Sequence, residues 1–466
     1  MPSWEYVPDG EPHVFGDRVY VYGSHDRFNG MAFCMNDYVC WSAPVTDLSD
    51  WKYEGVIWRK KNDPVKGRGL LFQMYAPDVV QGLDGRYYLY YFIGTTSTIG
   101  VAVCDTPAGE YEYLGRVRYP DGRVLGAGKD LHQFDPAVFR DGDRVYLYTG
   151  FAPRFPNPIT DFRRGNVNGA MGAELEPDML TVKLPTARIA KSVHNSRGTG
   201  FEGHEFFEAS SMRKFGDKYY FIYSSVNGHE LCYAVGDAPL GSFSYGGTLV
   251  SIGDLGLSDK PLNYLGNTHG SIEFINGEYY VFYHRHTNNH CFSRQACAER
   301  ITRTDDGRFL QAELTSCGLN DKPLAAKGEY GANIACHLFS KKGTRFMLFK
   351  RPAGCHPYFT QSGEDRERDP DQYVKNFCDG ATAGFKYFDF DGCAHGISVT
   401  VRGKAKGKIT VRDGLNGNTV AVIEIDNNRG ETKSFASKLN IAQGKKPLYF
   451  TYNGKGRPDF LSFRLG

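Results

Sequence analysis

The chain has 466 residues, and its 55 Lys and Arg nearly balance 53 Asp and Glu, for a formal net charge of +2. Because no excess of one charge covers the molecule, a nucleic-acid partner or an anionic membrane surface is not expected. The 55 Gly, 30 Tyr and 32 Phe favour many short strands joined by tight turns and exclude a long helical bundle.

The cysteines and the N-terminus point to the cytoplasm. Eleven cysteines are scattered from Cys34 to Cys393 without a C-x-x-C pair, so neither a zinc ribbon nor a full set of disulfides is expected. The chain does not start with a basic and then an apolar segment, and no apolar run approaches about 20 residues. We therefore expect a cytoplasmic protein without a membrane span, or a secreted one whose signal segment has been removed.

Five segments of the first three hundred residues share one pattern: a polar residue, a short strand, a glycine and a second strand rich in aromatic residues. Each segment predicts a β-hairpin that turns at the glycine. The glycines are Gly16, Gly85, Gly142, Gly216 and Gly277. One hairpin cannot bury both of its faces, whereas five units packed around an axis can. The repeat predicts a five-bladed β-propeller over residues 1–305, with an irregular sandwich as the alternative.

The polar residue that opens each repeat stands seven or eight residues before its glycine. These residues are Asp9, Asp78, Asp135, Glu208 and His269. Because the first strand of each blade lines the central channel, equivalent strand starts meet at one mouth. Carboxylates that gather at one place repel one another and lose solvation. Turn formation alone does not explain why a protein would bear this cost. Such a group can hold a hard cation or act as an acid and a base on a glycosidic bond.

The ordered motifs resemble those of glycoside hydrolase family 43. They are Asp9, Ala76-Pro77-Asp78, Phe134-Asp135-Pro136, Glu208 and Gly266 to Gly270. The resemblance covers about residues 1–305 and implies an inverting hydrolase acting on xylose- or arabinose-containing oligosaccharides or polysaccharides. It implies Asp9 as the general base, Asp135 as the residue that orients the acid and raises its pKa, and Glu208 as the general acid. No cofactor is implied beyond a structural Ca²⁺ or a water at His269.

Departures from the family pattern leave alternatives open for the base and the acid. Asp9 is followed by glycine where proline is usual, so Glu11 is a rival for the base. Glu208 is followed by Ala-Ser where Gly-Pro is usual, and Glu202 and Glu205 are alternatives for the acid.

Four residues are expected at the substrate. They are Asp78, Tyr75, Arg285 and His269. Asp78 either contacts the sugar or fixes its neighbours. Tyr75 stands where the family has tryptophan and keeps a ring on which a sugar can stack. Arg285 reaches a sugar hydroxyl or a carboxylate, or else forms a surface ion pair of little energetic value.

A cluster of three histidines could be interpreted as a metal site. His284, His286 and His290 have H-x-H-x₃-H spacing, in which the first two share a strand face. Since no acidic residue or cysteine supports a zinc site at this spacing, ordinary packing is the preferred interpretation.

The repeat stops after Arg303, and the last third has a different pattern. Residues 306–325 are predicted to be a connector and residues 326–466 a β-sandwich, on the basis of short alternating segments separated by turn signals. The segments are residues 396–401, 408–411, 419–425, 448–452 and 460–463. This part is similar to the jelly-roll carbohydrate-binding modules of family 6, and either sugar binding or packing is open to it.

The leading functional hypothesis is an exo-acting α-L-arabinofuranosidase or β-xylosidase for arabinoxylan or arabinan oligosaccharides. A non-catalytic glycan-binding propeller and an endo-arabinanase-type hydrolase are the alternatives, and the choice of exo over endo action depends on loops such as residues 24–36 and 154–172. The related fructan hydrolases carry Asn-Asp-Pro-Asn and Glu-Cys motifs, which are absent from this chain.

Overall fold

The computed structural model describes residues 1–65, 73–94, 96–155, 167–320 and 322–466, so residues 156–166 of the predicted loop 154–172 lie outside the described residues. The chain forms two compact units. The first comprises Met1–Val250, Asn267–Arg285 and Arg294–Ala312. The second comprises Ser251–Gly266, His286–Ser293 and Glu313–Gly466.

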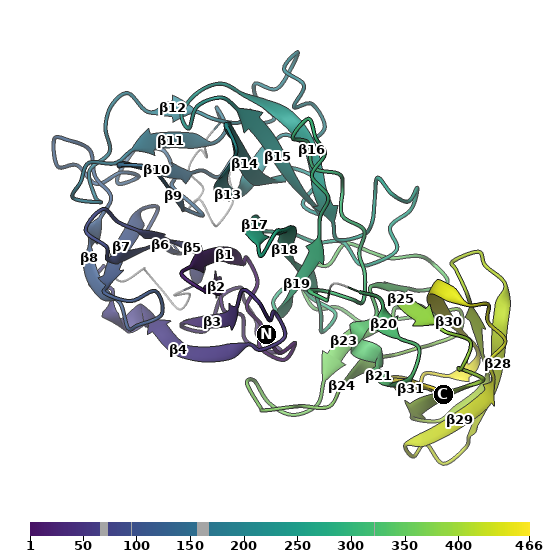
Figure 1. Ribbon diagram of the computed structural model, residues 1–466. Coiled ribbons are helices and arrows are strands. Elements are labelled where there is room, and N and C mark those ends of the chain that lie inside the picture. Colours follow the sequence, from purple (N-terminus) through teal and green to yellow (C-terminus); the bar gives the residue numbers. More distant parts are fainter. Residues whose placement is uncertain (66–72, 95, 156–166, 321) are drawn as a thin grey trace. The chain divides into compact units, whose positions relative to one another are not determined.

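The first unit consists of five antiparallel sheets whose strands follow one another in chain order (Figure 1). The first two sheets are β1 (Glu11–Phe15), β2 (Arg18–Tyr22), β3 (Tyr38–Pro44), β4 (Lys52–Trp58), and β5 (Met74–Gln81), β6 (Tyr87–Ile93), β7 (Ile99–Cys104), β8 (Glu112–Arg116). The next two are β9 (Ala137–Asp141), β10 (Arg144–Thr149), β11 (Met171–Glu174), β12 (Ala187–Arg188), and β13 (Phe206–Phe215), β14 (Lys218–Ser225), β15 (Glu230–Gly236), β16 (Phe243–Ser251). The fifth is β17 (Ser271–Ile275), β18 (Glu278–His286), β19 (Arg294–Arg300).

The first strands of the five sheets form a closed ring. β1 contacts β5, β5 contacts β9, β9 contacts β13, β13 contacts β17, and β17 contacts β1 again. They gather around the middle of this unit in Figure 1, and Gly10 pairs with Gly270 where the last blade meets the first. The predicted five-bladed propeller is confirmed.

Aromatic strands build the core because both of their faces are buried. Along β6, Tyr90 and Phe92 enter an apolar cluster shared with the third blade, whereas Leu89 and Tyr91 enter one shared with Trp58 of the first blade. Each blade is therefore held to its two neighbours by the alternate side chains of one strand.

The hairpin turns fall at the predicted glycines. All five have a positive φ, between 63° and 89°, a region that glycine enters without steric cost. In every blade the turn at this glycine therefore follows the polar residue of the repeat by seven or eight residues.

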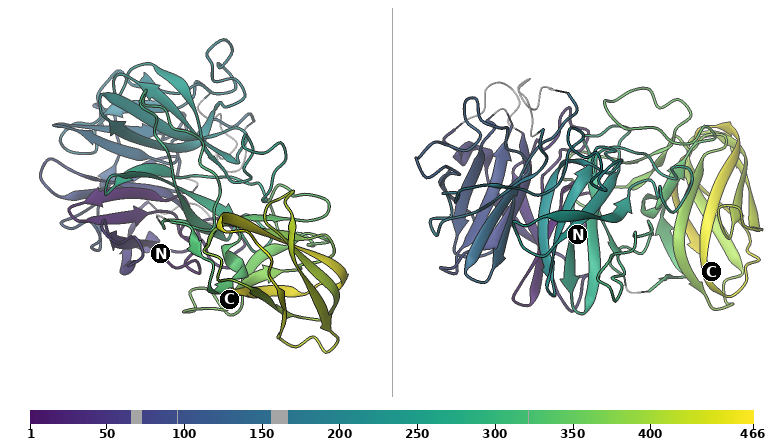
Figure 2. Two further views of the ribbon diagram at one scale, coloured as in Figure 1. Left: turned by 45° about the vertical axis from the view of Figure 1, so that its right-hand side comes forward. Right: turned by 90° about the horizontal axis from the view of Figure 1, so that it is seen from above.

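The second unit is a β-sandwich, drawn green to yellow in Figure 2. One sheet contains β20 (Leu324–Ala325), β25 (Thr382–Phe390), β30 (Gly444–Gly456), β27 (Ala405–Arg412) and β28 (Thr419–Asn427), with β22 (His337–Phe339) beside β25. The other contains β23 (Tyr358–Gln361), β24 (Gln372–Lys375), β31 (Asp459–Leu465), β26 (Gly396–Arg402) and β29 (Lys433–Lys438), with β21 (Gly328–Gly331) beside β31. Phe385 of one sheet packs edge-on against Phe463 of the other at 4.7 Å. The five predicted strands all fall within observed ones.

The division of the chain differs from the predicted boundaries at 305 and 325. Two loops of the propeller sequence, Ser251–Gly266 and His286–Ser293, belong to the second unit. Asp254 shows the physical reason, because its carboxylate binds His337 Nε2 at 2.6 Å and Lys386 Nζ at 3.2 Å. These partners lie 83 and 132 residues away in sequence, so no local pattern reveals the contact.

The described residues contain two short 3₁₀ helices with named bounds, Lys60–Asn62 and Ala332–Ile334. Among the described residues, no helix has the length and hydropathy that a membrane crossing needs. All eleven cysteines are free thiols.

Candidate active site

Asp9, Asp135 and Glu208 meet at one place in the first unit. The negative charge of Asp9 acts on the pKa of both other carboxyls, and Glu208 acts on that of Asp135. The backbone N–H of Ala209 donates to the Asp135 carboxylate. His269 Nδ1 lies 3.6 Å from Asp135 Oδ2 and 4.0 Å from Asp9 Oδ1. Three strand starts separated by more than seventy residues therefore converge, as the register predicts.

The backbone has an unusual conformation at Asp9, at Asp135 and at Ala209, the residue that follows Glu208. Asp9, Asp135 and Ala209 have φ values of 60°, 44° and 67°, which side-chain-bearing residues adopt rarely. The pairing of β13 with β14 shifts on both sides of Glu208, and such bulges re-aim side chains. Strained positions that cluster in this way are typical of functional sites.

Asp9 is held as an anion although it is buried. Arg294 Nη1 donates to Asp9 Oδ1 at 2.7 Å, and His284 Nδ1 lies 3.3 Å from the same oxygen. Burial alone would raise the pKa of Asp9, but the charge of Arg294 and the contact with His284 outweigh it and hold the pKa well below its usual range.

Arg294 is itself fixed by a second buried carboxylate. Its Nε and Nη2 donate to Asp26 Oδ2 and Oδ1 at 2.8 and 3.0 Å, a two-point contact that sets the plane of the guanidinium. Phe33 lies against that plane at 4.9 Å. Arg294 and Asp26 are outside the repeat, and the sequence analysis missed both.

Arg285, the arginine predicted to contact a sugar hydroxyl or a carboxylate, binds a glutamine side chain in the structure. Its Nε and Nη2 donate to Gln295 Oε1 at 3.0 and 2.9 Å. The arginine that binds a predicted catalytic carboxylate is thus Arg294, at the start of β19.

Glu208 and Asp135 are pushed in the opposite direction from Asp9. Burial and the nearby Asp9 charge raise the pKa of Glu208 to about 8, and the charge of Arg294 offsets this only in part. Burial, Glu208 and Asp9 also raise the pKa of Asp135 well above its usual value. Near neutrality the mouth therefore holds an ionised carboxylate, Asp9, beside the protonated carboxyl of Glu208.

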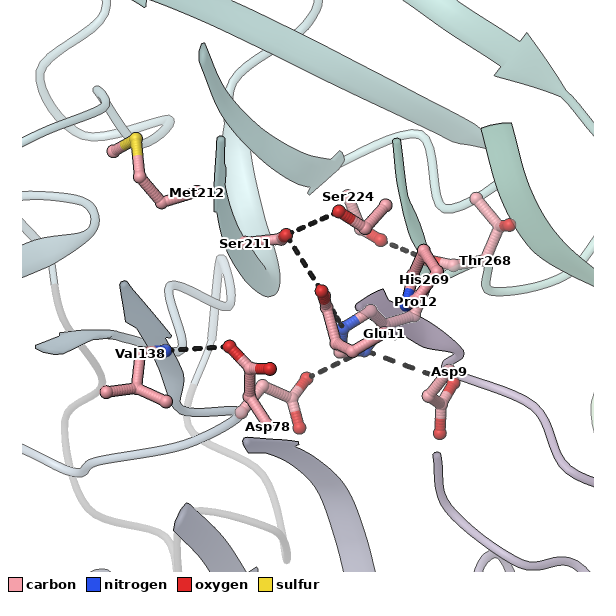
Figure 3. Close-up of polar contacts among 12 residues, drawn as sticks. Asp9, Glu11, Pro12, Asp78, Val138, Ser211, Met212, Ser224, Thr268 and His269 are labelled. Atoms are coloured by element: carbon pink, nitrogen blue, oxygen red, sulfur yellow. Dashed lines mark hydrogen bonds and ion pairs between the residues drawn. The ribbon is translucent and has the colours of Figure 1, made fainter. Parts of the chain in front are cut away.

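Glu11, the rival for the base, occupies a different environment (Figure 3). Its Oε2 accepts from Ser211 Oγ at 3.0 Å and from Arg213 Nη2 at 3.1 Å. Burial and the charge of Asp78 raise its pKa well above the usual value despite Arg213. A base must be ionised before it can take a proton, and this favours Asp9 over Glu11.

The two rivals for the acid are also placed elsewhere. Glu202 is exposed and accepts the backbone N–H of Gly198. Glu205 accepts from Ser196 Oγ at 3.0 Å. Glu208, by contrast, interacts with both Asp9 and Asp135.

Asp78 binds neighbouring strands. Oδ1 lies 2.6 Å from His13 Nε2 and accepts from Val79 N at 2.7 Å, while Oδ2 accepts from Val138 N at 2.7 Å (Figure 3). These contacts join β5 to β1 and β9. Of the two roles considered for Asp78, this geometry supports the fixing of neighbours.

Tyr75 lies beside the acids and is mostly covered. Its ring packs against Phe134 at 5.0 Å and Phe92 at 5.8 Å, and 9% of the residue is exposed. Burial is the main cause that raises its pKa, and Asp135 and Glu208 contribute. The ring therefore packs mainly on protein.

The three clustered histidines do not act together. His284 contacts Asp9, which the packing interpretation did not anticipate, and its Nε2 donates to the Asn267 carbonyl at 2.9 Å. His286 and His290 belong to the second unit. The potential metal-ligand groups found in the described part of the chain include none of the three.

The family model for glycosyl hydrolases family 43 matches residues 7–309. A xylosidase/arabinosidase of Thermoclostridium stercorarium is 51% identical over 473 residues, covering 100% of this chain and 98% of that protein. Among solved structures, a family 43 β-xylosidase/α-arabinofuranosidase from a compost metagenome, in complex with xylotriose and in a calcium-free form, has a TM-score of 0.52. It shares 27% identity and covers 67% of this chain and 96% of its own.

A family 43 enzyme of Xanthomonas citri in complex with xylose has a TM-score of 0.53 and 25% identity, over 67% of this chain and 91% of its own. The residues that match the family model include all five sheets of the propeller and all three converging acids. This chain is a glycoside hydrolase and belongs to family 43.

Proposed function

We propose that the protein removes xylose or arabinofuranose from arabinoxylan or arabinan oligosaccharides by exo-acting, inverting hydrolysis. The observation that carries the proposal is the opposite protonation of two carboxyls at one mouth, Asp9 ionised and Glu208 protonated. The name of the relative that matches over the full length, a xylosidase/arabinosidase, supports the choice of sugar. So do the xylotriose and xylose bound in two related structures.

In the proposed mechanism Asp9 accepts a proton from a water molecule, whose oxygen attacks the anomeric carbon. Glu208 donates its proton to the glycosidic oxygen as the bond to the leaving group breaks. Asp135, which receives the Ala209 N–H, keeps Glu208 oriented, while burial and the charge of Asp9 keep the pKa of Glu208 high. Water enters opposite the leaving group, so the product anomer is inverted, and a carboxyl separation of about 6.5–9.5 Å is expected.

The first prediction tests the two roles with aryl arabinofuranosides and aryl xylosides. Glu208→Ala should lose about 10²–10⁴ in rate on unactivated oligosaccharides but much less on sugars with acidic aryl leaving groups, which need little proton assistance. Asp9→Ala should lose activity on both, since water activation is always needed. Steady-state rates and NMR of the first-formed anomer provide the measurements.

Two results would contradict this assignment. Equal losses for both variants on both substrates would remove the distinction between acid and base. If the wild type bound oligosaccharide without turning over either aryl glycoside, the non-catalytic glycan-binding alternative would be correct.

The second prediction concerns pH. The acid must be protonated, so kcat/KM should fall as pH rises through about 8, where Glu208 titrates. Asp9 has a lowered pKa and stays ionised, so no acidic limb from the base is expected above about pH 4. A kcat/KM that stays constant between pH 7 and pH 9 would exclude Glu208 as the titrating acid.

The third prediction concerns Arg294. Without its charge, burial should raise the pKa of Asp9, so an arginine variant should acquire an acidic limb. We pair Arg294→Gln with Asp26→Asn, because loss of one partner alone leaves a buried charge uncompensated. The double variant should acquire an acidic limb between pH 7 and pH 5, with kcat/KM falling about tenfold for each pH unit below the raised pKa of Asp9.

Arg285→Gln is the matched control, since it makes the same chemical change at an arginine bonded to Gln295. It should keep the wild-type profile. A double variant without an acidic limb, or an Arg285→Gln variant with one, would show that Arg294 does not hold Asp9 ionised.

The fourth prediction concerns a metal in the channel. His269 Nε2 and Glu11 Oε1 are buried, lack hydrogen-bond partners among the described residues, and lie 3.9 Å apart. The carboxylate oxygen suits a Ca²⁺ ion completed by waters, and the imidazole nitrogen suits a water molecule, either alone or in the shell of that ion. His269 and Glu11 would hold the ion, which would supply positive charge near Asp9 and Asp135.

If Ca²⁺ is structural, a chelator should lower the midpoint of thermal unfolding and added Ca²⁺ should restore it. The gain would be about 2.7 kcal/mol at a concentration one hundred times the Kd. Activity far below the midpoint should persist without Ca²⁺. His269→Ala should abolish the response, and a wild type that does not respond to Ca²⁺ would assign the gap to water.

A further inference from the structure

The fourth blade holds a second polar cluster that the proposed hydrolysis does not use. His204 Nδ1 lies 2.8 Å from Glu230 Oε2, and Cys232 Sγ lies 3.5 Å from the same oxygen. One ligand atom from each residue lies within 4.8 Å of the others. Glu230 and Cys232 are two residues apart on β15 (Figure 1), so their side chains leave the strand on the same face. Imidazole, carboxylate and thiolate are the ligands that Zn²⁺ takes in proteins.

The distances come close to those of a zinc site. Zinc–ligand bonds of about 2.0–2.3 Å in a tetrahedron place neighbouring ligand atoms about 3.4–3.7 Å apart. The contact between Cys232 and Glu230 already has this length. The contact between His204 and Glu230 would have to open by only about 0.6 Å from its 2.8 Å. The third pair, His204 and Cys232, lies within 4.8 Å and would have to come to a similar separation for the ion to bind.

Neighbouring groups already orient the ligands. The His204 ring stacks on Tyr245 with centroids 4.9 Å apart and planes 11° apart. Ser225 Oγ and Asn227 Nδ2 donate to the two Glu230 oxygens at 3.0 and 3.2 Å. Outer partners of this kind fix ligand direction in metal sites.

The cluster is buried on one side and open on the other. Cys232 is fully buried beside the aromatic core of the blade, and the Glu230 side chain is 11% exposed. The His204 side chain is 36% exposed and provides the route by which an ion can enter. His229 Nε2 lies 4.0 Å from Glu230 Oε1, the oxygen that does not contact Cys232, so its ring would have to turn to reach a fourth coordination position.

We propose that His204, Glu230 and Cys232 form a zinc-binding site, with His229 or water as the fourth ligand. The ion replaces the thiol proton of Cys232, forming a Zn–S bond and releasing the proton to solvent. His204 lies two residues before β13, the strand that carries Glu208, so the ion would tie the chain just before that strand to β15.

The test titrates the metal-free full-length protein with Zn²⁺ against a chromophoric chelator and by calorimetry in two buffers of different ionisation enthalpy. We expect one ion per chain and release of at least one proton. Cys232→Ser and His204→Gln should each weaken binding by about 100-fold or more. X-ray absorption should show one sulfur ligand at about 2.3 Å.

Cys393→Ser, which removes an exposed thiol outside the cluster, is the matched control and should bind like the wild type. Unchanged circular dichroism and unfolding midpoints in chelator establish that the variants are folded, and the near-isosteric Cys232→Ser suffices if His204→Gln is not. Equal binding by wild type and Cys232→Ser, or no binding, would overturn the proposal and leave a hydrogen-bond network. Glu208→Ala should retain zinc binding, so this result is independent of hydrolysis.

Discussion

Burial of Asp9 would by itself neutralise its carboxyl, and the ion pair with Arg294 keeps it charged. The guanidinium can serve Asp9 because Asp26 takes its other edge and fixes its direction. Asp9 and Arg294 are 285 residues apart and belong to the first and fifth blades. They meet because the last inner strand closes the ring against the first, where Gly10 pairs with Gly270. The charge of the proposed base therefore depends on closure of the propeller.

The same few charges have the opposite effect on Glu208. Asp9, which Arg294 holds ionised, repels a second negative charge and, together with burial, raises the pKa of Glu208 to about 8. An acid and a base thus arise from identical functional groups because one of them binds the arginine and the other faces the resulting anion. Without the other charges of the site, neither Asp9 nor Glu208 would have the shifted pKa that its proposed role requires. The charged residues of the site therefore act as a unit.

The repeat register predicted much of the fold and the site, because Asp9, Asp135 and Glu208 each stand at or near the beginning of an inner strand, seven or eight residues before a glycine turn. Arg294 and Asp26 could not be found in this way. Arg294 begins the outer strand β19, Asp26 lies in a loop, and neither position recurs from blade to blade. The predicted Arg285 was favoured by its place next to His284, yet it donates to Gln295. Likewise, the segments that join the second unit are loops whose partners, such as His337 for Asp254, are distant in sequence.

Asp78 shows why register alone does not assign a role. It shares the seven-residue spacing of Asp9 and Asp135, but its two oxygens receive His13 and the backbone N–H groups of Val79 and Val138. A carboxylate saturated by fixed donors is a strong link between strands and a poor proton carrier, because its lone pairs are already used. Glu208 lies near the beginning of β13, in the inner strand of its blade, and its pKa is shifted by burial and by the charges of Asp9 and Arg294. The sequence places these acids at one mouth, and the donors around each acid decide whether it holds the blades together or carries a proton.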